Sequence, residues 1–326
     1  MNKENVLLIA VGGIGFRHFQ ALMNCQSDFV LYVVDVSREA LEQARSYAEE
    51  QKSQRWIRYY STVSEIESSV CFRIAIIATS SLVRRSVFEE LITGFPVETI
   101  IFEKVLFPKV EDYDAVERLL EENHVVAYVN CPRRLLDIYR NLREKVCLSG
   151  KLHAQIKGNN WGLACNSIHM LDLFAYLSAS DPEYVTCSGS LLEDSIYDSK
   201  RKGYIEFYGK LTGKIGEKTT YLIECGHGEP SSLIELFTDT TYFCIDEGNG
   251  LLTAQELNSG ELVKQNFRLS YVSQTTTQVI DRLLSGQEIG LTRYEESKLL
   301  HIPILREFIR KRNEIRGKED ELCPIT

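Results

Sequence analysis

The stretch NVLLIAVGGIG (residues 5–15) decides the fold of the first part of this chain. Its apolar, β-branched run predicts a buried strand, and its glycines predict a tight turn that opens a helix. Ala10, Gly12 and Gly15 occupy the three positions of a GxGxxG pattern, with alanine in place of the first glycine. That pattern serves a tight turn, close approach of a diphosphate to the backbone, and close helix–strand packing. Ala10 can serve the turn if its φ is negative.

The next strand, FVLYVVDV (29–36), places an acidic residue where a dinucleotide needs one. Asp35 follows Gly15 by 20 residues, the spacing at which a carboxylate binds ribose hydroxyls. NAD(H) is favoured, because the carboxylate disfavours a 2′-phosphate, but Arg38 weakens this preference and NADP(H) is not excluded. The alternative is a plain β–α turn with Asp35 as a turn or N-cap residue. The backbone groups expected to hold the diphosphate belong to Gly12, Gly13, Ile14 and Gly15.

The first 130 residues alternate between buried strands and helices. Further strands are expected at 56–60, 73–81, 98–104 and 125–130. Helices are expected at 17–25, 38–51, 83–93 and 110–123. Near-continuous apolar strands that alternate with helices predict an α/β fold with a doubly wound parallel sheet, a Rossmann domain.

After Pro132 the pattern changes to that of a second domain. Helices are expected at 134–147, 165–177 and 296–315, with Pro303 as a kink or a start of the last. A strand at 151–158 and short alternating strands over 184–272 predict an open, mostly antiparallel sheet. The expected division is an NAD-binding Rossmann domain at 1–130 and a second α/β domain at 131–326.

The bulk composition limits the partners. The 326 residues are 44% hydrophobic and 25% charged, and the formal net charge of −9 argues against a nucleic-acid partner. No apolar run reaches the roughly 18–20 residues of a membrane helix, and the first residues do not resemble a signal peptide. The nine cysteines lack metal-binding spacings, so we expect free thiols, no metal and a cytoplasmic location.

Five motifs, in order, resemble the glucose–fructose oxidoreductase / inositol dehydrogenase / MocA-like family. VGGIGFRHFQAL resembles its GxGxxGxxH start, IAIIATSS its strand ending in IATP, and VNCPRRL its arginine-containing stretch. IFEKVLFP resembles its EKP segment, with Val105 in place of proline, and NSIHMLDLF its DxGxHxxDL helix. The resemblance covers about residues 5–180 well and the C-terminal sheet in outline.

This resemblance implies hydride transfer between a nicotinamide cofactor and a carbon bearing oxygen, on a sugar, polyol or sugar nucleotide. It also implies a C-terminal domain that binds this substrate and packs against another copy, as a homodimer or homotetramer. Lys104 carries over as the substrate-orienting cation and His169 as the general acid or base. The family's aspartate does not carry over, because Cys165 stands in its place. The residues that match the family's cofactor-binding segments are Thr79, Ser80 and Glu103.

At 100° per residue, Cys165, His169 and Asp172 share one face of the 165–177 helix. Asp172 is expected to orient or charge-pair His169, and the alternative is a buried structural pair. Cys165 is more typical of a packing residue than of a nucleophile. Further residues expected near substrate are Asn166, Trp161 and Arg134.

Each of these also has a structural alternative. In the structural alternative, the Trp161 ring fills space in the core, and Arg133 and Arg134 form a surface pair at the start of a helix. His18 either approaches the cofactor or packs in the core. The substrate and the direction of reaction stay open. The competing class of function is a nucleotide-binding regulator or scaffold without turnover, since Cys165 replaces the usual aspartate.

Overall fold

The computed structural model describes residues 3–269 and 272–326, which form two compact units. The described parts of the first unit are 3–107, 112–132 and 272–294, and those of the second are 108–111, 133–269 and 295–326. Residues 272–294 therefore belong with the first unit, whereas the sequence placed them in a domain at 131–326. The boundary at residue 130 followed a local change of pattern, and such a pattern does not register a later return of the chain.

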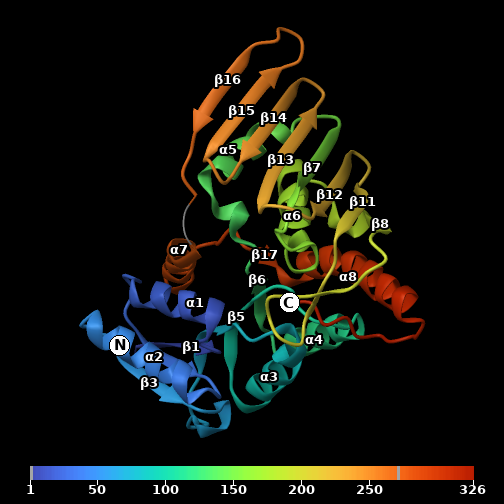
Figure 1. The fold of residues 1–326 in the computed structure, drawn as a ribbon. Helices are drawn as coiled ribbons and strands as arrows, with labels where there is room; N and C mark the ends of the chain where they lie inside the picture. The colour runs from blue at the N-terminus through green and yellow to red at the C-terminus, as the bar shows by residue number, and fades with distance from the viewer. Residues whose placement is uncertain (1–2, 270–271) are drawn as a thin grey trace. The chain divides into compact units, whose positions relative to one another are not determined.

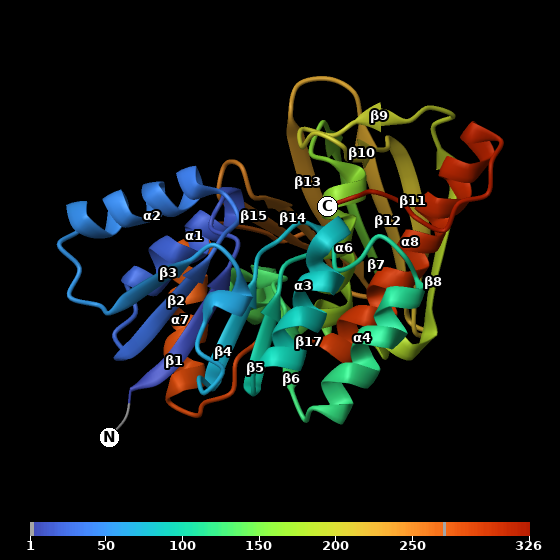
Figure 2. The same cartoon turned by 90° about the horizontal axis from the view of Figure 1, so that it is seen from below.

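The first unit is built on a seven-stranded sheet with the order β17-β6-β5-β4-β1-β2-β3. Six strands are parallel, and β17 pairs with β6 in the antiparallel sense. The chain moves outward from β1 in both directions, which is the doubly wound arrangement expected from the sequence (Figure 2). The strands are β1 (Glu4–Ile9), β2 (Phe29–Val34), β3 (Ile57–Tyr60), β4 (Phe72–Ile77), β5 (Val97–Phe102), β6 (Val126–Val129) and β17 (Thr292–Arg293).

The helices of this unit follow from the strands, because parallel strands need crossover connections. They are α1 (Gly13–Met23), α2 (Arg38–Glu50), α3 (Ser81–Gly94), α4 (Glu111–Glu122) and α7 (Val272–Leu284), with the 3₁₀ turn η1 (Val63–Glu65). The sequence did not predict α7, which packs on α1. Thr277 donates a hydrogen bond to the Ala21 carbonyl, and Asp281 accepts from the backbone amides of Gln26 and Ser27.

The second unit contains an open eight-stranded sheet with the order β16-β15-β14-β13-β7-β12-β11-β8 (Figure 1). Among the described strands of this sheet, only the β7–β12 pair is parallel, so the prediction of a mostly antiparallel sheet is confirmed. The strands are β7 (Leu152–Asn159), β8 (Val185–Leu192), β11 (Gly209–Ile215), β12 (Thr219–Gly226), β13 (Ser231–Thr238), β14 (Thr241–Asp246), β15 (Leu251–Glu256) and β16 (Leu262–Asn266). A small separate ladder joins β9 (Tyr197–Asp198) and β10 (Ile205–Glu206).

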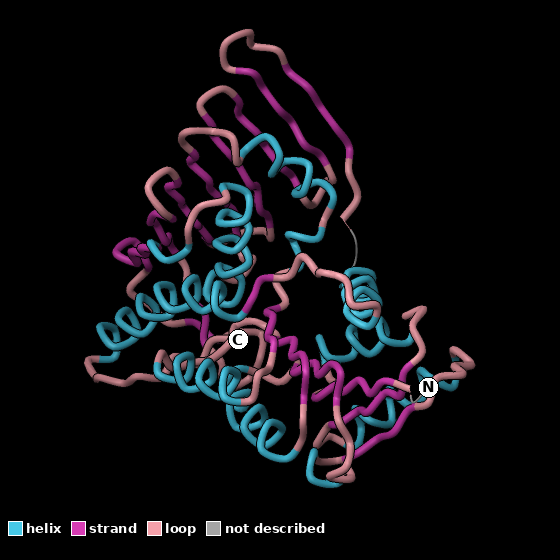
Figure 3. Tube along the Cα trace, turned by 180° about the vertical axis from the view of Figure 1, so that it is seen from behind, coloured by secondary structure: helices cyan, strands magenta, loops and turns pink. Residues whose placement is uncertain are grey.

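Helices α5 and α6 lie on one face of this sheet (Figure 3). The helical elements here are α5 (Asp137–Val146), α6 (Leu163–Ser178) and α8 (Tyr294–Arg316), with the 3₁₀ turns η2 (Pro132–Leu135) and η3 (Pro182–Tyr184). Pro303 does not start this helix, because α8 continues through it. Among the described residues, no helix combines the length and the apolar character required to cross a membrane.

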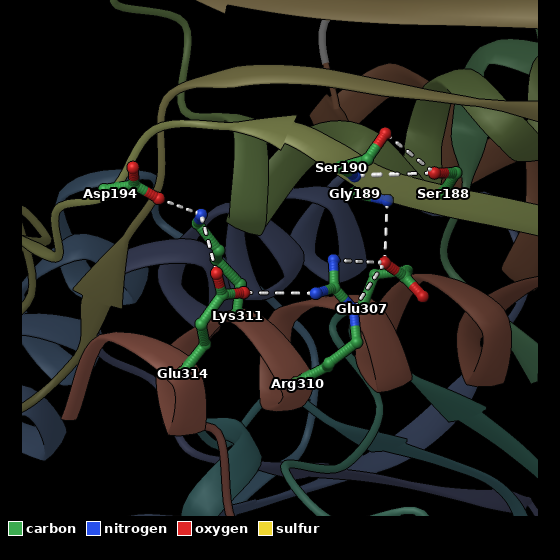
Figure 4. A network of polar contacts seen from close by, with 8 residues as sticks. All are labelled: Ser188, Gly189, Ser190, Asp194, Glu307, Arg310, Lys311 and Glu314. Atoms are coloured by element: carbon green, nitrogen blue, oxygen red, sulfur yellow. Dashed lines mark hydrogen bonds and ion pairs between the residues drawn. The ribbon is translucent and has the colours of Figure 1, made fainter. Parts of the chain in front are cut away.

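A polar network fixes α8 along β8, the end strand of the second sheet (Figure 4). Glu307 accepts a hydrogen bond from the backbone amide of Gly189 at 2.7 Å, and Arg310 donates to the same carboxylate oxygen at 3.0 Å. Lys311, whose side chain is only 6% exposed, pairs with Asp194 in the chain that follows β8. These contacts give an otherwise unpaired sheet edge a fixed helical neighbour.

Candidate functional site

The glycine turn between β1 and α1 has the conformation that a dinucleotide turn requires, with one departure from expectation. Ala10 has φ +69°, in the left-handed region, whereas we expected a negative φ. Alanine adopts this left-handed conformation at a cost in free energy, because its Cβ approaches the following carbonyl. Gly15 cannot carry a side chain, since an added Cβ would lie 1.9 Å from the Ala10 carbonyl oxygen. Gly12, by contrast, has nothing within 4 Å of an added Cβ.

Replacing Ala10 with glycine should therefore stabilise the protein. Relief of the left-handed strain outweighs the extra freedom of the unfolded chain, so the free energy of unfolding should rise by about 1 kcal/mol. Urea unfolding of Ala10→Gly beside the wild type measures this. The matched control is Ala40→Gly in α2, which should lose about 1 kcal/mol because glycine disfavours a helix. A loss in both variants would mean that Ala10 is not strained.

Asp35 links the end of β2 to the glycine turn. Its carboxylate accepts hydrogen bonds from the backbone amide of Val11 at 2.7 Å and from that of Ser37 at 2.8 Å. The helix N-cap is Ser37, whose hydroxyl accepts from Ala40, so Asp35 is a turn residue and not the cap. A carboxylate has about four acceptor positions, so these two bonds leave capacity for ribose hydroxyls. Arg38 is the first residue of α2 and is exposed.

Two helix N-termini at the carboxyl edge of this sheet lack side-chain caps. Gly12 is the N-cap of α1 and Ser80 is the N-cap of α3, and neither supplies a side-chain hydrogen bond to its helix. The two helices follow β1 and β4, which pair directly with each other. The first amide groups of a helix have no intrahelical acceptor, and they attract anions. The start of α1, beside the glycine turn, thus has the donors that a diphosphate needs.

Glu103 follows β5, but its carboxylate is occupied within the protein. The side chain is buried, and it accepts hydrogen bonds from His18 of α1 at 2.8 Å and from Asn130 after β6 at 2.5 Å. Burial alone would raise the pKa of Glu103, but His18, Asn130 and the charge of Lys104 together bring that pKa below its usual value. Both of these contacts are within the protein, and the cofactor contact expected for Glu103 stays a prediction. His18, which also hydrogen-bonds Thr276 of α7, is in the packing role.

In the second unit, α6 carries the predicted substrate-side residues. His169 and Cys165 are partly exposed and stand one turn apart on the helix. Asn166 donates to the Trp161 carbonyl at 2.6 Å, and Cys165 donates to the Gly162 carbonyl at 3.6 Å. The Trp161 indole donates to the Glu224 carbonyl at 3.0 Å, which fixes this half-buried ring against β12. These contacts hold the start of α6 in a defined geometry.

Arg134 and Asp172 form a buried ion pair, which the sequence did not predict. Arg134 Nε donates to Asp172 Oδ2 at 2.8 Å, and Arg134 Nη2 donates to Glu296 Oε1 at 2.6 Å. Asp172 is completely buried and Arg134 is 7% exposed. Burial alone would lower the pKa of Arg134, but the two carboxylates raise it above its usual range. Arg134 is thus neither a surface residue nor a guanidinium with its donors directed at a ligand.

The neighbouring Arg133 is only partly exposed, and it too is paired within the protein. It forms a two-pronged pair with Glu247, with N–O distances of 3.0 and 2.8 Å, and Tyr139 donates to the same carboxylate at 2.7 Å. Burial raises the pKa of the Tyr139 hydroxyl. The two arginines that follow Pro132 therefore anchor η2 to different parts of the second unit.

Sequence reasoning missed Glu206, a buried carboxylate at the start of α6. Glu206 accepts hydrogen bonds from the backbone amides of Ala164 and Phe207. The N-cap of α6 is Gly162, which has φ +82° and no side chain, so a residue of β10 supplies the cap instead. Burial raises the pKa of Glu206. Because 42 residues separate Glu206 from Ala164, no local motif could have indicated this contact.

The described residues contain neither a disulfide nor a cluster of metal-ligating side chains. All nine cysteines are free thiols. Within residues 3–269 and 272–326, no group of three or more His, Cys, Asp or Glu side chains could hold a metal ion.

Comparison with solved structures shows the fold. No family model matches the chain, and no curated protein matches it by sequence. UDP-N-acetylglucosamine 3-dehydrogenase GnnA from Acidithiobacillus ferrooxidans is similar, with TM-score 0.68 and 16% identity over 94% of this chain and 97% of that chain. An oxidoreductase from Agrobacterium radiobacter, in complex with NAD+, L-tartaric acid and magnesium, has TM-score 0.71 and 13% identity over 97% and 99%.

A third similar structure has a different activity in its name. It is the super-repressor mutant of Gal80p from Saccharomyces cerevisiae, with TM-score 0.71 and 13% identity over 97% of this chain and 97% of that one. At such identities the likeness establishes the architecture alone. The chain has an α/β fold with a Rossmann-type sheet and a second, open and mostly antiparallel sheet, as expected from its sequence.

Proposed function

We propose that this protein is an NAD(H)-dependent oxidoreductase of the glucose–fructose oxidoreductase / inositol dehydrogenase / MocA-like family. It transfers hydride to or from a hydroxyl-bearing or keto carbon of a sugar, polyol or sugar-nucleotide derivative. The observation that carries this proposal is the carboxyl edge of the first sheet, where the glycine turn, two uncapped helix N-termini and Asp35 come together. The similar structures of GnnA and of the NAD+-bound oxidoreductase support it.

The residues at this edge fit a dinucleotide. Gly12 and Gly13 are exposed, with open space where a Cβ would lie, so a diphosphate can reach the backbone amides of Gly12, Gly13, Ile14 and Gly15. Asp35 binds the ribose hydroxyls, which favours NAD(H) over NADP(H), and Arg38 keeps NADP(H) as the second choice. Thr79 and Ser80 line the same edge after β4. When bound, the nicotinamide accepts or supplies the hydride.

The chain's own groups handle the proton and the developing charge. His169 takes the hydroxyl proton during oxidation and returns it during reduction, because an imidazole exchanges protons near neutral pH. Lys104, in the loop after β5, stabilises negative charge on the substrate oxygen. The contacts of Asn166, Trp161 and Cys165 shape the substrate side of α6.

Binding and turnover test this function separately. NADH fluorescence should show binding by the wild type and weaker binding by Asp35→Ala. A panel of keto- and hydroxy-sugars, polyols and sugar nucleotides should then show turnover. His169→Ala should lower kcat on the active substrate by roughly 100- to 10,000-fold and leave the Kd for NADH unchanged, because general acid–base catalysis contributes that much. His153→Ala in β7 is the matched control and should leave both unchanged.

Contrary results point to specific parts of the proposal. Wild-type turnover by His169→Ala would remove the acid–base role. Unchanged NADH binding by Asp35→Ala would remove the ribose role. Tight NADH binding without turnover of any compound in the panel would favour the competing class, a nucleotide-binding regulator or scaffold.

Assembly and location complete the proposal. We propose a homodimer or homotetramer that forms through the second sheet, whose end strand β16 exposes Leu262 and Val263. Light scattering of purified protein measures this, and a monomer at micromolar concentration would contradict it. The free thiols fit a reducing compartment, so the proposed location is the cytoplasm.

A further inference from the structure

Arg84 of α3 is a buried cation whose partners include three backbone carbonyls. Its side chain is 1% exposed. Nη1 donates to the carbonyl oxygens of Val105 and Leu106, the latter at 2.8 Å, and Nη2 donates to the carbonyl oxygen of Thr79. Thr79 follows β4, and Val105 and Leu106 follow β5. One guanidinium therefore joins two loops at the carboxyl edge of the first sheet.

Such a residue is costly to bury unless its donors are used. Removing a guanidinium from water is unfavourable, and only well-made hydrogen bonds offset that cost. A planar fork of donors can bind carbonyls in two loops simultaneously, whereas a lysine ammonium is a single point donor. These contacts thus favour arginine over lysine at position 84. Because one side chain holds both loops, a shift of the loop after β4 moves the loop after β5 as well.

Lys104 lies within the stretch that these contacts fix. On one side Glu103 is held by His18 and Asn130, and on the other side Arg84 holds the carbonyl groups of Val105 and Leu106. Tyr113 of α4 donates to the next carbonyl, that of Phe107, at 3.2 Å. Consecutive residues on both sides of Lys104 are therefore bound by three helices, α1, α3 and α4, and by Asn130 after β6.

We propose that Arg84 is the positioning residue that sets the nicotinamide half of the cofactor site. This inference rests on the proposed function. In a doubly wound sheet the adenosine half of a dinucleotide lies over β1 and β2, and the other half lies over the strands beyond the switch point. Arg84 acts on the loops after β4 and β5, so it governs only the nicotinamide side.

Two ligands separate this role from general stability. NADH carries the nicotinamide, and ADP-ribose lacks it but keeps the diphosphate and the adenosine. Arg84→Lys should bind NADH roughly tenfold more weakly, as expected for the loss of one charge-assisted hydrogen bond, and should bind ADP-ribose within about twofold of the wild type. Fluorescence titration and calorimetry measure the two affinities, and thermal melting reports folding.

The matched control is Arg55→Met. Arg55 also donates to two backbone carbonyls, those of Ser27 and Cys25, but in the loop that leads into β2, at the amino edge of the same sheet. It should lower the melting temperature and leave both affinities unchanged. If Arg84→Lys does not fold, Tyr113→Phe loosens the same loop through the Phe107 carbonyl and should weaken NADH binding selectively.

The outcomes are distinct. Selective loss of NADH affinity supports the positioning role. Wild-type NADH affinity in a folded Arg84→Lys protein, or equal loss for NADH and ADP-ribose, overturns it. If the wild type binds neither ligand, the proposed function itself fails and the role of Arg84 fails with it.

Discussion

Gly15→Ala is expected to unfold the first unit or to lower its free energy of unfolding by about 3 kcal/mol or more, at the upper end of overpacking costs. The new Cβ would lie 1.9 Å from the carbonyl oxygen and 2.8 Å from the carbonyl carbon of Ala10. Both atoms belong to the backbone, so no side chain can move aside. Either β1 or α1 must shift, and both are buried on the sheet side. Urea unfolding of the purified variant measures the loss.

Gly12→Ala is the matched control for that result. Gly12 has φ −81° and open space around an added Cβ, so alanine fits without strain. Stability should stay within about 0.5 kcal/mol of the wild type, as for most surface substitutions. NADH binding should nevertheless weaken, because the methyl group fills the space where the diphosphate approaches. Equal stability loss in the two variants would contradict the close contact between Gly15 and Ala10.

Arg134→Met is expected to lower the free energy of unfolding by about 3–5 kcal/mol, because it breaks a buried ion pair by removing one partner. Asp172 has no exposure to water, and Arg134 is the cation that pairs with it at 2.8 Å. The double variant Arg134→Met, Asp172→Leu should recover part of the loss, since it removes both charges. Chemical unfolding of the single and double variants gives the coupling between the two residues.

An exposed pair supplies the comparison for Arg134. Arg140 pairs with Asp137 in α5, where the side chains are 52% and 87% exposed. Arg140→Met should change stability by less than about 1 kcal/mol, because exposed ion pairs contribute little. If Arg134→Met also lowers the free energy of unfolding by less than about 1 kcal/mol, the guanidinium is not needed for the fold. The prediction that Arg134 contacts substrate would then stand again.

The strands of the first unit could be predicted because they are buried on both faces. Runs such as VLLI in β1 and FVLYVV in β2 are almost uniformly apolar, and a parallel sheet covered by helices produces that pattern. The hairpin β13–β14 was less evident. It reads as one apolar stretch, LIELFTDTTYFCID, and its turn at Asp239 and Thr240 became clear only with the strand pairing.

The candidate site could be predicted only as far as local spacing reaches. The glycine turn and Asp35 lie within one βαβ unit, so their spacing carried information. Arg134 is 38 residues from Asp172 in the sequence, and Asn130 and His18 are 27 and 85 residues from Glu103. Contacts between residues so far apart produce no periodic pattern in the sequence. Ala10 shows a different limit, because the fold holds an alanine in a conformation that its own preference opposes.

The return of residues 272–294 to the first unit has a consequence for synthesis. Until α7 is made, α1 lacks the helix that packs on it, and Phe102 lacks the ring of Tyr294 at 5.9 Å. The ribosome must first translate the whole second sheet, which takes on the order of ten seconds or more at typical rates. During that time the nascent first unit lacks the cover that α7 gives to α1. A chain cut after residue 132 should stay in that immature, aggregation-prone state.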